Sequence, residues 1–214
     1  RLDVSSLKTL KPVSISFLTS ICLKALLVRS PEEFKEDGVD VYLNTMVKKI
    51  LSKHNEVLVY KDNEAEIVPY DKLIIATGAR TIIPNIKGIS DFKNVYTLRR
   101  IQDAIDIKDR MQKSSNIVII GSGYIGLELL EAFVRNGKHV TVIEKESHII
   151  PLYDPEMSDI IKSAIESSHG DNIDFITGES VVEVQGDNND LNKIITSTGR
   201  EINADMLVVC AGVR

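Results

Sequence analysis

A glycine-rich turn between two apolar segments constrains the fold of this 214-residue chain more than any other feature. Residues 121–126 read Gly-Ser-Gly-Tyr-Ile-Gly. They follow the apolar run 116–120 and open the segment 124–136, in which apolar residues recur at helical spacing. A strand, a glycine turn and a helix in this order begin a βαβ unit of the Rossmann type. The sequence therefore predicts an α/β fold.

The spacing of the glycines matches a turn that binds a dinucleotide. Gly121 permits a tight turn, Gly123 lets the backbone approach a pyrophosphate, and Gly126 lets the helix pack closely on the strand. Glu144 ends the next predicted strand, 23 residues after Gly121. A carboxylate there accepts hydrogen bonds from ribose hydroxyls and repels a 2′-phosphate, which favours NAD over NADP. Lys145 could tolerate the phosphate, and a glycine turn that binds nothing remains an alternative.

Two segments of the chain resemble each other. Residues 39–80 and 173–214 align without a gap at an offset of 134, with seven identical positions. Each copy ends in a continuous apolar run, 72–76 or 206–210, followed by a glycine turn. A strand that is apolar on both faces is typical of a parallel sheet covered by helices on both sides. A duplicated unit is therefore expected.

The remaining expected elements follow from periodicity and turn residues. In the second half, strands are predicted at 139–144 and 173–175, and a turn at 186–190 is predicted between strands at 181–185 and 193–197. Helices are predicted at 100–111, 124–136 and 154–168. In the first half, the expected elements are a helix at 31–36 capped by Ser30, a short strand at 39–43, a hairpin of 46–51 with 56–60, and a loop-rich crossover at 81–96.

Composition excludes several classes of protein. Hydrophobic residues make up 43% and charged residues 27% of the chain, which is typical of a globular domain and not of a disordered one. The net charge of −5 gives no basic surface for nucleic acid. No run approaches the roughly 20 apolar residues of a membrane helix, and the two cysteines fit a reducing cytoplasm. Partners are therefore expected to be small-molecule nucleotides, with no nucleic acid and no membrane.

The start of the chain is less informative. The apolar run 12–23 could be a signal-peptide core, but no small-residue cleavage site follows it. The first residue is not Met, which suggests a fragment or a processed product.

Several motifs together resemble a known family. Residues 76–80 read Ala-Thr-Gly-Ala-Arg and are followed by Pro84 and Gly88. The segment 121–128, Glu144 and the closing residues 210–214 complete the set. This combination is similar to the FAD- and NAD(P)-dependent pyridine nucleotide-disulfide oxidoreductases. The segment 121–128 most resembles the branch of NADH oxidases, NADH peroxidases and coenzyme A-disulfide reductases.

The resemblance implies a two-domain flavoprotein. A Rossmann-like NAD(P)-binding domain, residues 98–214, would be inserted into a partial FAD-binding domain, residues 1–97. The implied cofactors are NADH and FAD, and hydride would pass from nicotinamide to flavin and then to oxygen, peroxide or a disulfide. Alternatives are a reductase of rubredoxin or ferredoxin, and an inactive nucleotide-binding module. A homodimer is possible for a full-length form.

The resemblance also implies roles for individual residues. Tyr124 would cover the flavin, Glu128 would lie near the nicotinamide pocket, and the backbone of Val47 would lie near the FAD adenine. Alternatives are helix packing for Tyr124, a solvated face for Glu128 and a core strand for Val47. The implied cofactor-binding set is Val47, Ala76, Thr77, Gly78, Gly121, Ser122, Gly123, Tyr124, Ile125, Gly126, Glu128, Glu144, Lys145, Gly212 and Val213.

The sequence departs from the family pattern near its start. Residues 1–24 contain no glycine, so the FAD glycine turn is missing. Cys22 follows Ser16 and Phe17 in a segment similar to a redox-cysteine motif, but no Gly-Leu-Pro follows, so an inert thiol is expected. Cys210 lies in an apolar run, where a small buried residue is expected. No catalytic residue and no metal site are assigned.

Overall fold

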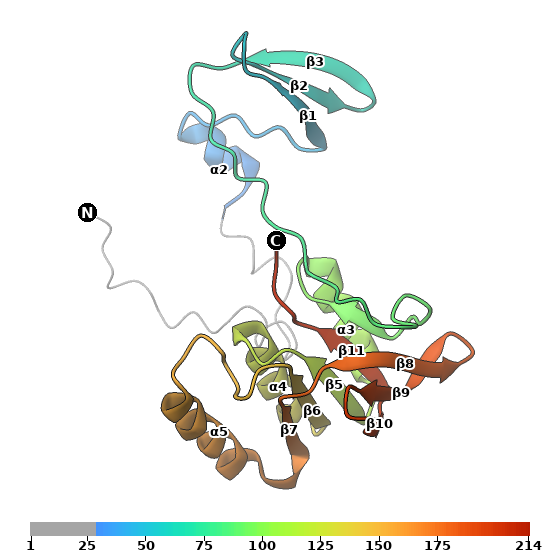
Figure 1. The fold of residues 1–214 in the computed structure, drawn as a ribbon. Coiled ribbons are helices and arrows are strands. Elements are labelled where there is room, and N and C mark those ends of the chain that lie inside the picture. The colour runs from blue at the N-terminus through green and yellow to red at the C-terminus, as the bar shows by residue number, and fades with distance from the viewer. Residues whose placement is uncertain (1–28) are drawn as a thin grey trace. The chain divides into compact units, whose positions relative to one another are not determined.

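The computed structural model describes residues 29–214 and divides them into two compact units, 29–78 and 79–214 (Figure 1). The expectations for Cys22 and for the apolar run 12–23 lie outside the described residues. The predicted domain boundary between residues 97 and 98 differs from the boundary between the units, because residues 79–97 pack with the second unit. The assignment of the two domains to FAD and NADH stays a prediction.

Unit 79–214 is built on a five-stranded parallel sheet (Figure 1). The strand order is β4 (Val95–Thr97), β11 (Met206–Val209), β5 (Asn116–Ile120), β6 (His139–Glu144) and β7 (Ile173–Thr177). The helices of this unit are α3 (Ile101–Met111), α4 (Tyr124–Arg135), α5 (Pro155–His169) and the short η3 (Gly170–Asn172). The predicted α/β class and each predicted helix of this half are confirmed, with ends that shift by one residue.

The two faces of the parallel sheet have different covers. Ile117 and Ile119 of β5 pack with α3 and α4, whereas Val118 and Ile120 face the opposite side. That side is covered by a three-stranded antiparallel sheet of β8 (Val181–Asp187), β9 (Asp190–Thr196) and β10 (Glu201–Asn203). The expectation of helices on both faces is therefore wrong. A run that is apolar on both faces shows only that both are covered.

Strand β4 lies at the edge of the sheet, where the sequence predicted a loop through residue 96. Buried Asn94 anchors its start: the side-chain amide donates to the backbone oxygens of Leu191 and Asp205 at 3.0 and 2.8 Å, and its oxygen accepts from the Leu191 N–H at 2.7 Å. A three-residue strand is too short to show a period, so only its partners β11 and Asn94 define it.

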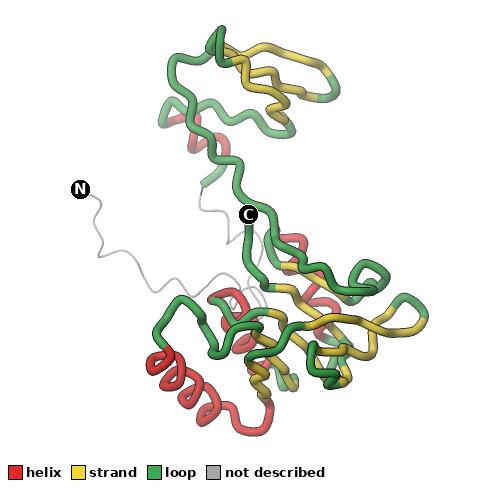
Figure 2. Tube along the Cα trace, in the orientation of Figure 1, coloured by secondary structure: helices red, strands yellow, loops and turns green. Residues whose placement is uncertain are grey.

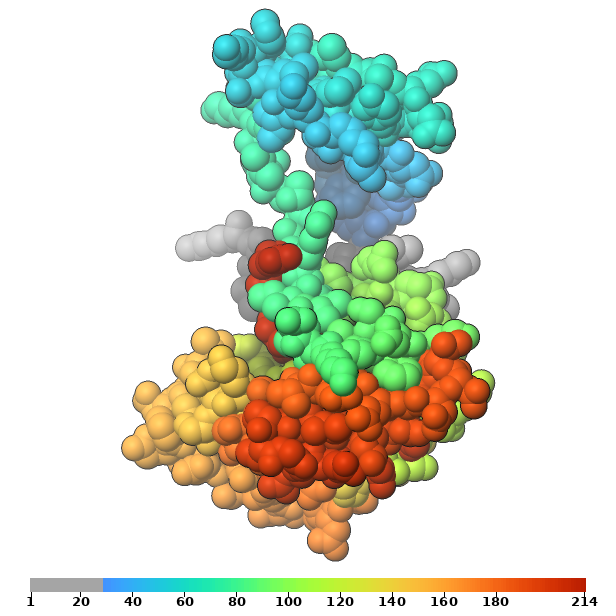
Figure 3. All heavy atoms as spheres, turned by 45° about the vertical axis from the view of Figure 1, so that its right-hand side comes forward, coloured from blue at the N-terminus to red at the C-terminus, as the bar shows by residue number. Residues whose placement is uncertain are grey.

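The crossover before β4 adds a backbone contact to β8. Lys87 donates its N–H to the Val182 oxygen at 3.0 Å and accepts from the Val184 N–H at 2.8 Å. The backbone conformation of Gly88 has φ +80°, and a Cβ there would lie 2.5 Å from the Val184 oxygen. The crossover, drawn in green, therefore lies directly on the orange strand in Figure 3.

Unit 29–78 holds one short helix and a three-stranded antiparallel sheet. Helix α2 (Pro31–Glu36) begins after Ser30, which forms the predicted cap together with Glu33. The sheet runs β1 (Thr45–Leu51), β2 (Glu56–Lys61) and β3 (Glu64–Pro69), so the predicted hairpin is confirmed. Asp62 and Asn63 both have positive φ, as in a type I′ turn between β2 and β3.

The duplication holds for the antiparallel sheets but not for the strands around them. Sheet β1-β2-β3 has the same order as β8-β9-β10. Residues 72–76, however, form no strand but an extended loop (Figure 2), and Ile74 is 89% exposed. Residues 39–43 form no strand either. Both strand predictions are wrong because the described part of this unit offers no parallel neighbour, whereas β11 lies between β4 and β5.

Candidate nucleotide-binding site

The glycine-rich turn lies at the carboxyl end of β5, between the ends of β6 and β11 (Figure 1). The Gly121 N–H donates to the Ile143 oxygen at 2.9 Å, and the Cys210 N–H donates to the Ile120 oxygen at 2.7 Å. Ligands of open α/β sheets bind outside the carboxyl ends of the strands. The structure therefore places the turn where a ligand site of this fold belongs.

Two of the three glycines are required by the packing of the protein itself. Gly121 has φ +95°, and a Cβ there would lie 2.6 Å from the Cys210 oxygen. A Cβ on Gly126 would lie 2.1 Å from the Gly121 oxygen. The tight turn and the close approach of helix to strand follow from these contacts.

Gly123 differs from its neighbours. It precedes α4 with φ −69°, a conformation open to any residue, and a Cβ added there would meet no atom of residues 29–214 within 4 Å. Helices leave the N–H groups of their first turn unpaired, and these groups attract anions. Among the described residues, no backbone hydrogen bond uses the N–H of Gly123 or Tyr124. The described part of the chain thus leaves space beside Gly123 for an anionic ligand.

Glu144 lies beside the glycine turn, as its spacing predicted. Its Oε2 atom accepts two hydrogen bonds from Ser122, one from the backbone N–H and one from the hydroxyl, both at 2.8 Å. Its Oε1 atom accepts from the Glu146 N–H at 3.0 Å. The residue is only 8% exposed and Ser122 is fully buried, whereas Lys145 is exposed. The carboxylate is therefore fixed before any ligand arrives.

The loop after β6 adds a residue that the sequence did not indicate. Ile150 has φ +46°, which is rare for a β-branched side chain and costs conformational energy. Its N–H lies 3.2 Å from both the backbone oxygen and the hydroxyl oxygen of Ser122. The strained residue thus ties the loop to the glycine turn.

A pair of tyrosines lies at the start of α4. The Tyr124 hydroxyl donates to the Tyr153 hydroxyl at 3.3 Å, and the rings meet edge to face with centroids 6.2 Å apart. The hydrogen bond with Tyr153 raises the pKa of Tyr124. Tyr124 is 53% exposed, so helix packing does not account for it. Its predicted place over a flavin is not tested.

The other predicted NADH-site residues lie on two elements. Glu128 is partly buried on α4 and lines a groove of about 270 Å³ that Ile165 and His169 of the α5 region also line. Gly212 follows β11 with φ +97° and accepts a hydrogen bond from the Ile82 N–H at 2.9 Å. Val213 pairs with Thr81 and is exposed. Glu128 is therefore not on a fully solvated face.

The residues predicted to hold FAD lie in unit 29–78. Val47 is 54% exposed on β1, next to a register shift, so a core role for it is wrong. Ala76, Thr77 and Gly78 are exposed, and Gly78 has φ +73°. Within residues 29–78 no glycine turn opens a helix that could cradle a pyrophosphate. The described residues therefore do not by themselves fit FAD.

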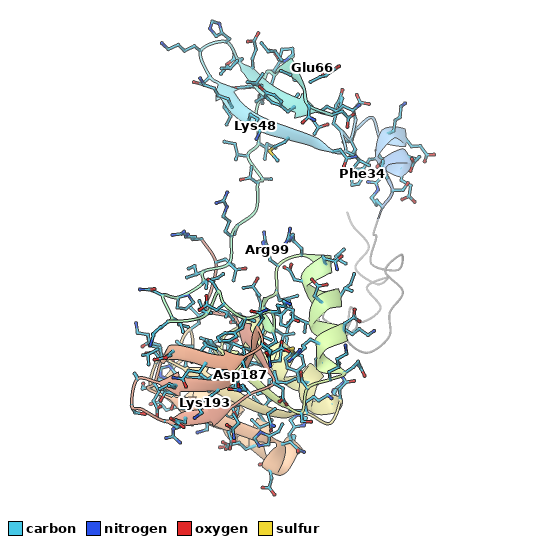
Figure 4. The ribbon with its side chains drawn as sticks, turned by 90° about the vertical axis from the view of Figure 1, so that its right-hand side faces the viewer. Phe34, Lys48, Glu66, Arg99, Asp187 and Lys193 are labelled. Carbon is cyan, nitrogen blue, oxygen red and sulfur yellow. The ribbon has the colours of Figure 1, made fainter. Side chains whose placement is uncertain are left out.

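Other candidate features carry no chemistry. Burial raises the pKa of the Cys210 thiol to about 12, which makes it a poor nucleophile. Asp187 and Lys193, labelled in Figure 4, are among the residues that line a polar hollow of about 630 Å³, but Lys193 already pairs with Glu201 at 2.7 Å. From residue 29 onward, no three His, Cys, Asp or Glu side chains gather as metal ligands. No helix in the same range is long and apolar enough to span a bilayer.

Comparisons with known proteins agree with this architecture. The family model of the pyridine nucleotide-disulphide oxidoreductases matches residues 10–214. The NAD(P)H sulfur oxidoreductase (CoA-dependent) of Pyrococcus abyssi is 34% identical, over 86% of this chain and 40% of the relative. The rubredoxin-NAD(+) reductase of Pseudomonas putida is 30% identical, over 94% and 51%. The NADH oxidase of Enterococcus faecalis is 32% identical, over 88% and 42%.

Solved structures show the same fold. Reduced Bacillus anthracis CoADR-RHD superposes with a TM-score of 0.85 and 26% identity, over 94% of this chain and 36% of that one. The water-forming NADH oxidase of Lactobacillus brevis, solved with NADH, gives a TM-score of 0.82 and 28% identity, over 94% and 44%. The chain thus spans about half or less of the length of these relatives. It belongs to the pyridine nucleotide-disulphide oxidoreductase family.

Proposed function

We propose that this chain is the NADH-binding part of a flavin-dependent oxidoreductase. Gly123 carries the proposal, because glycine stands there although neither its φ nor its neighbours require it. The space that a side chain would fill is suited to the pyrophosphate of NADH, next to the unpaired N–H groups at the start of α4. Ser122, Tyr124 and Ile125 surround that position.

Glu144 favours NADH over NADPH in this proposal. The fixed carboxylate would accept a hydrogen bond from a ribose hydroxyl, whereas a 2′-phosphate would meet a negative charge that cannot move away. The Lactobacillus brevis oxidase was solved with NADH, and an engineered variant of it, a water-forming NADPH oxidase that is 27% identical to this chain, was solved with NADPH. A few substitutions therefore change the choice between NADH and NADPH in a protein of this fold. Exposed Lys145 is free to turn into solvent.

Family membership supports the reaction. When bound, the flavin of such enzymes accepts hydride from the nicotinamide. In this chain, Tyr124, Glu128, Gly212 and Val213 would surround the nicotinamide and orient it. Val47 and the segment 76–78 would contribute to the FAD site, but the described residues form only part of one.

The electron acceptor stays open between the branches of the family. Three relatives of 30–34% identity are named as a sulfur oxidoreductase, an NADH oxidase and a rubredoxin reductase. Similarity therefore does not select oxygen, peroxide, a disulfide or a small redox protein as the acceptor. The incomplete FAD site favours a second candidate for the chain alone: a nucleotide-binding module without catalysis. A homodimeric full-length form and a cytoplasmic location stay predictions.

Calorimetric titration with NADH tests the proposal. The chain should bind one NADH, and Gly123→Val should abolish binding because its side chain occupies the pyrophosphate position. Loss of the N-terminal glycine cap should cost no more than about 1 kcal/mol, so the variant should stay folded by circular dichroism. Equal NADH affinity of a folded Gly123→Val protein would contradict the assignment.

A further inference from the structure

We propose that Ser122 is a positioning residue that sets the preference for NADH over NADPH by fixing the carboxylate of Glu144. The inference rests on the proposed function and goes beyond it, because Ser122 acts without touching the ribose. Its hydroxyl and its backbone N–H converge on one oxygen of Glu144. Two donors from one buried residue hold that oxygen in a single place.

The strained loop decides where the Ser122 hydroxyl proton goes. The Ile150 N–H lies 3.2 Å from the Ser122 hydroxyl oxygen and approaches it as a donor. A serine hydroxyl has one proton to donate, so an incoming donor leaves that proton to the acceptor on the other side. That acceptor is Oε2 of Glu144, at 2.8 Å. The positive φ of Ile150 is the conformation that brings its N–H to the turn.

The hydrogen bonds also determine which oxygen is left for a ligand. Oε2 already accepts two hydrogen bonds from Ser122, and Oε1 accepts one from the Glu146 N–H. A carboxylate oxygen accepts about two, so Oε1 keeps room for one ribose hydroxyl. Without the Ser122 hydroxyl the carboxylate can rotate, which weakens the bond to the ribose. The same rotation lets it withdraw from a 2′-phosphate.

The test compares two buried serines. Ser122→Ala removes the hydroxyl that holds Glu144. Ser114→Ala is the matched control, because Ser114 is 2% exposed and its hydroxyl donates at 3.1 Å to the Arg110 oxygen, before the start of β5 and not at the glycine turn. Calorimetric titrations with NADH and NADPH give the affinity ratio of each protein. Ser122→Ala should narrow the NADH preference about tenfold, as expected for one lost hydrogen bond to a charged group. Ser114→Ala should leave the ratio unchanged.

A double-mutant cycle separates positioning from general destabilisation. In a Glu144→Gln protein the charge is gone, so adding Ser122→Ala should change the ratio little. If Ser122→Ala does not fold, Ser122→Gly removes the same hydroxyl with less crowding and replaces it in the cycle.

The outcomes distinguish the two levels of the proposal. A starting chain that binds neither nucleotide overturns the proposed function and this inference with it. If the starting chain binds NADH, either of two results overturns only the role of Ser122. One is an unchanged ratio in Ser122→Ala, and the other is an equal shift in Ser114→Ala.

Discussion

The carboxylate of Glu144 stabilises the glycine turn and, in the proposed site, would also accept a hydrogen bond from the ligand. Its two bonds to Ser122 join the end of β6 to the glycine turn, and its Oε1 atom accepts only one hydrogen bond, from the Glu146 N–H. A substitution at Glu144 therefore acts on the fold and on nucleotide choice together. Designs that change this residue alone leave the donors of Ser122 buried without their acceptor.

Glu144→Arg should narrow or invert the preference for NADH, because a guanidinium can hold a 2′-phosphate through two hydrogen bonds. The structure adds a cost: the unsatisfied donors of Ser122 should destabilise the protein by about 1–3 kcal/mol. Paired titrations with NADH and NADPH measure the first effect, and chemical denaturation measures the second. A starting chain that binds NADPH as tightly as NADH would show that Glu144 does not act on the ribose.

Cys210 should be an unreactive thiol. Burial raises its pKa to about 12, so in a Cys22→Ser chain, where it is the only thiol, alkylation should keep accelerating as the pH rises beyond 9. Because the unfolded thiol loses its proton at lower pH than the folded one, the free energy of unfolding should fall between pH 9 and about 12. An alkylation rate that levels off near pH 9 would indicate an exposed thiol.

The sequence predicted the candidate site residues that belong to the strand-turn-helix pattern. It missed the residues whose positions depend on tertiary contacts. The glycines and Glu144 follow from the strand-turn-helix pattern. Ile150 and Tyr153 lie in an irregular loop, and nothing in the local sequence indicates a positive φ at an isoleucine. Their positions depend on contacts with Ser122 and Tyr124, which only the folded chain brings together.

At the scale of elements, the two similar apolar runs show that neighbouring strands determine whether an apolar run forms a strand. Residues 206–210 and 72–76 are alike in sequence, but β11 is buried between two parallel strands and 72–76 is an exposed loop. Hydrophobic patterning predicted β5, β6, α3, α4 and α5 closely, because the helices carry their own period and the two strands are short apolar runs bounded by turn residues. It overpredicted strands at 39–43 and 72–76, since a run of apolar residues does not supply a partner.

The aligned leucines of the two runs offer a matched test. Leu207 in β11 is fully buried and Leu73, 134 residues earlier, is 38% exposed. Leu207→Ala should lower the free energy of unfolding by about 2–5 kcal/mol because it leaves a cavity in the core. Leu73→Ala should cost less than about 1 kcal/mol. Chemical denaturation of the two variants provides the comparison, and equal losses would mean that residues 72–76 are packed after all.

At the scale of the whole chain, the two units differ in what they can hold. Unit 79–214 contains a glycine turn, a fixed carboxylate and two apolar cores. The described part of unit 29–78 contains the short helix α2 and an antiparallel sheet, with no cradle for a pyrophosphate. Nucleotide binding should therefore be a property of the second unit.

The purified chain should be nearly colourless and should lack NADH oxidase activity. The described residues give FAD no glycine turn at a helix start, so any flavin should be lost on gel filtration. Absorption near about 450 nm, where bound flavin absorbs, is the measurement. One FAD per chain after gel filtration would show that residues outside 29–214 complete the FAD site.

The central claim, that NADH binds at the glycine turn of unit 79–214, is tested most directly by an amide-resolved NMR titration. On addition of NADH, the amide signals of Gly123, Tyr124 and Ile125 should shift together and saturate at one NADH per chain, because these N–H groups face the pyrophosphate position. The amide signals of β1, β2 and β3 should not shift. Saturable shifts that leave residues 121–126 unaffected would contradict the account.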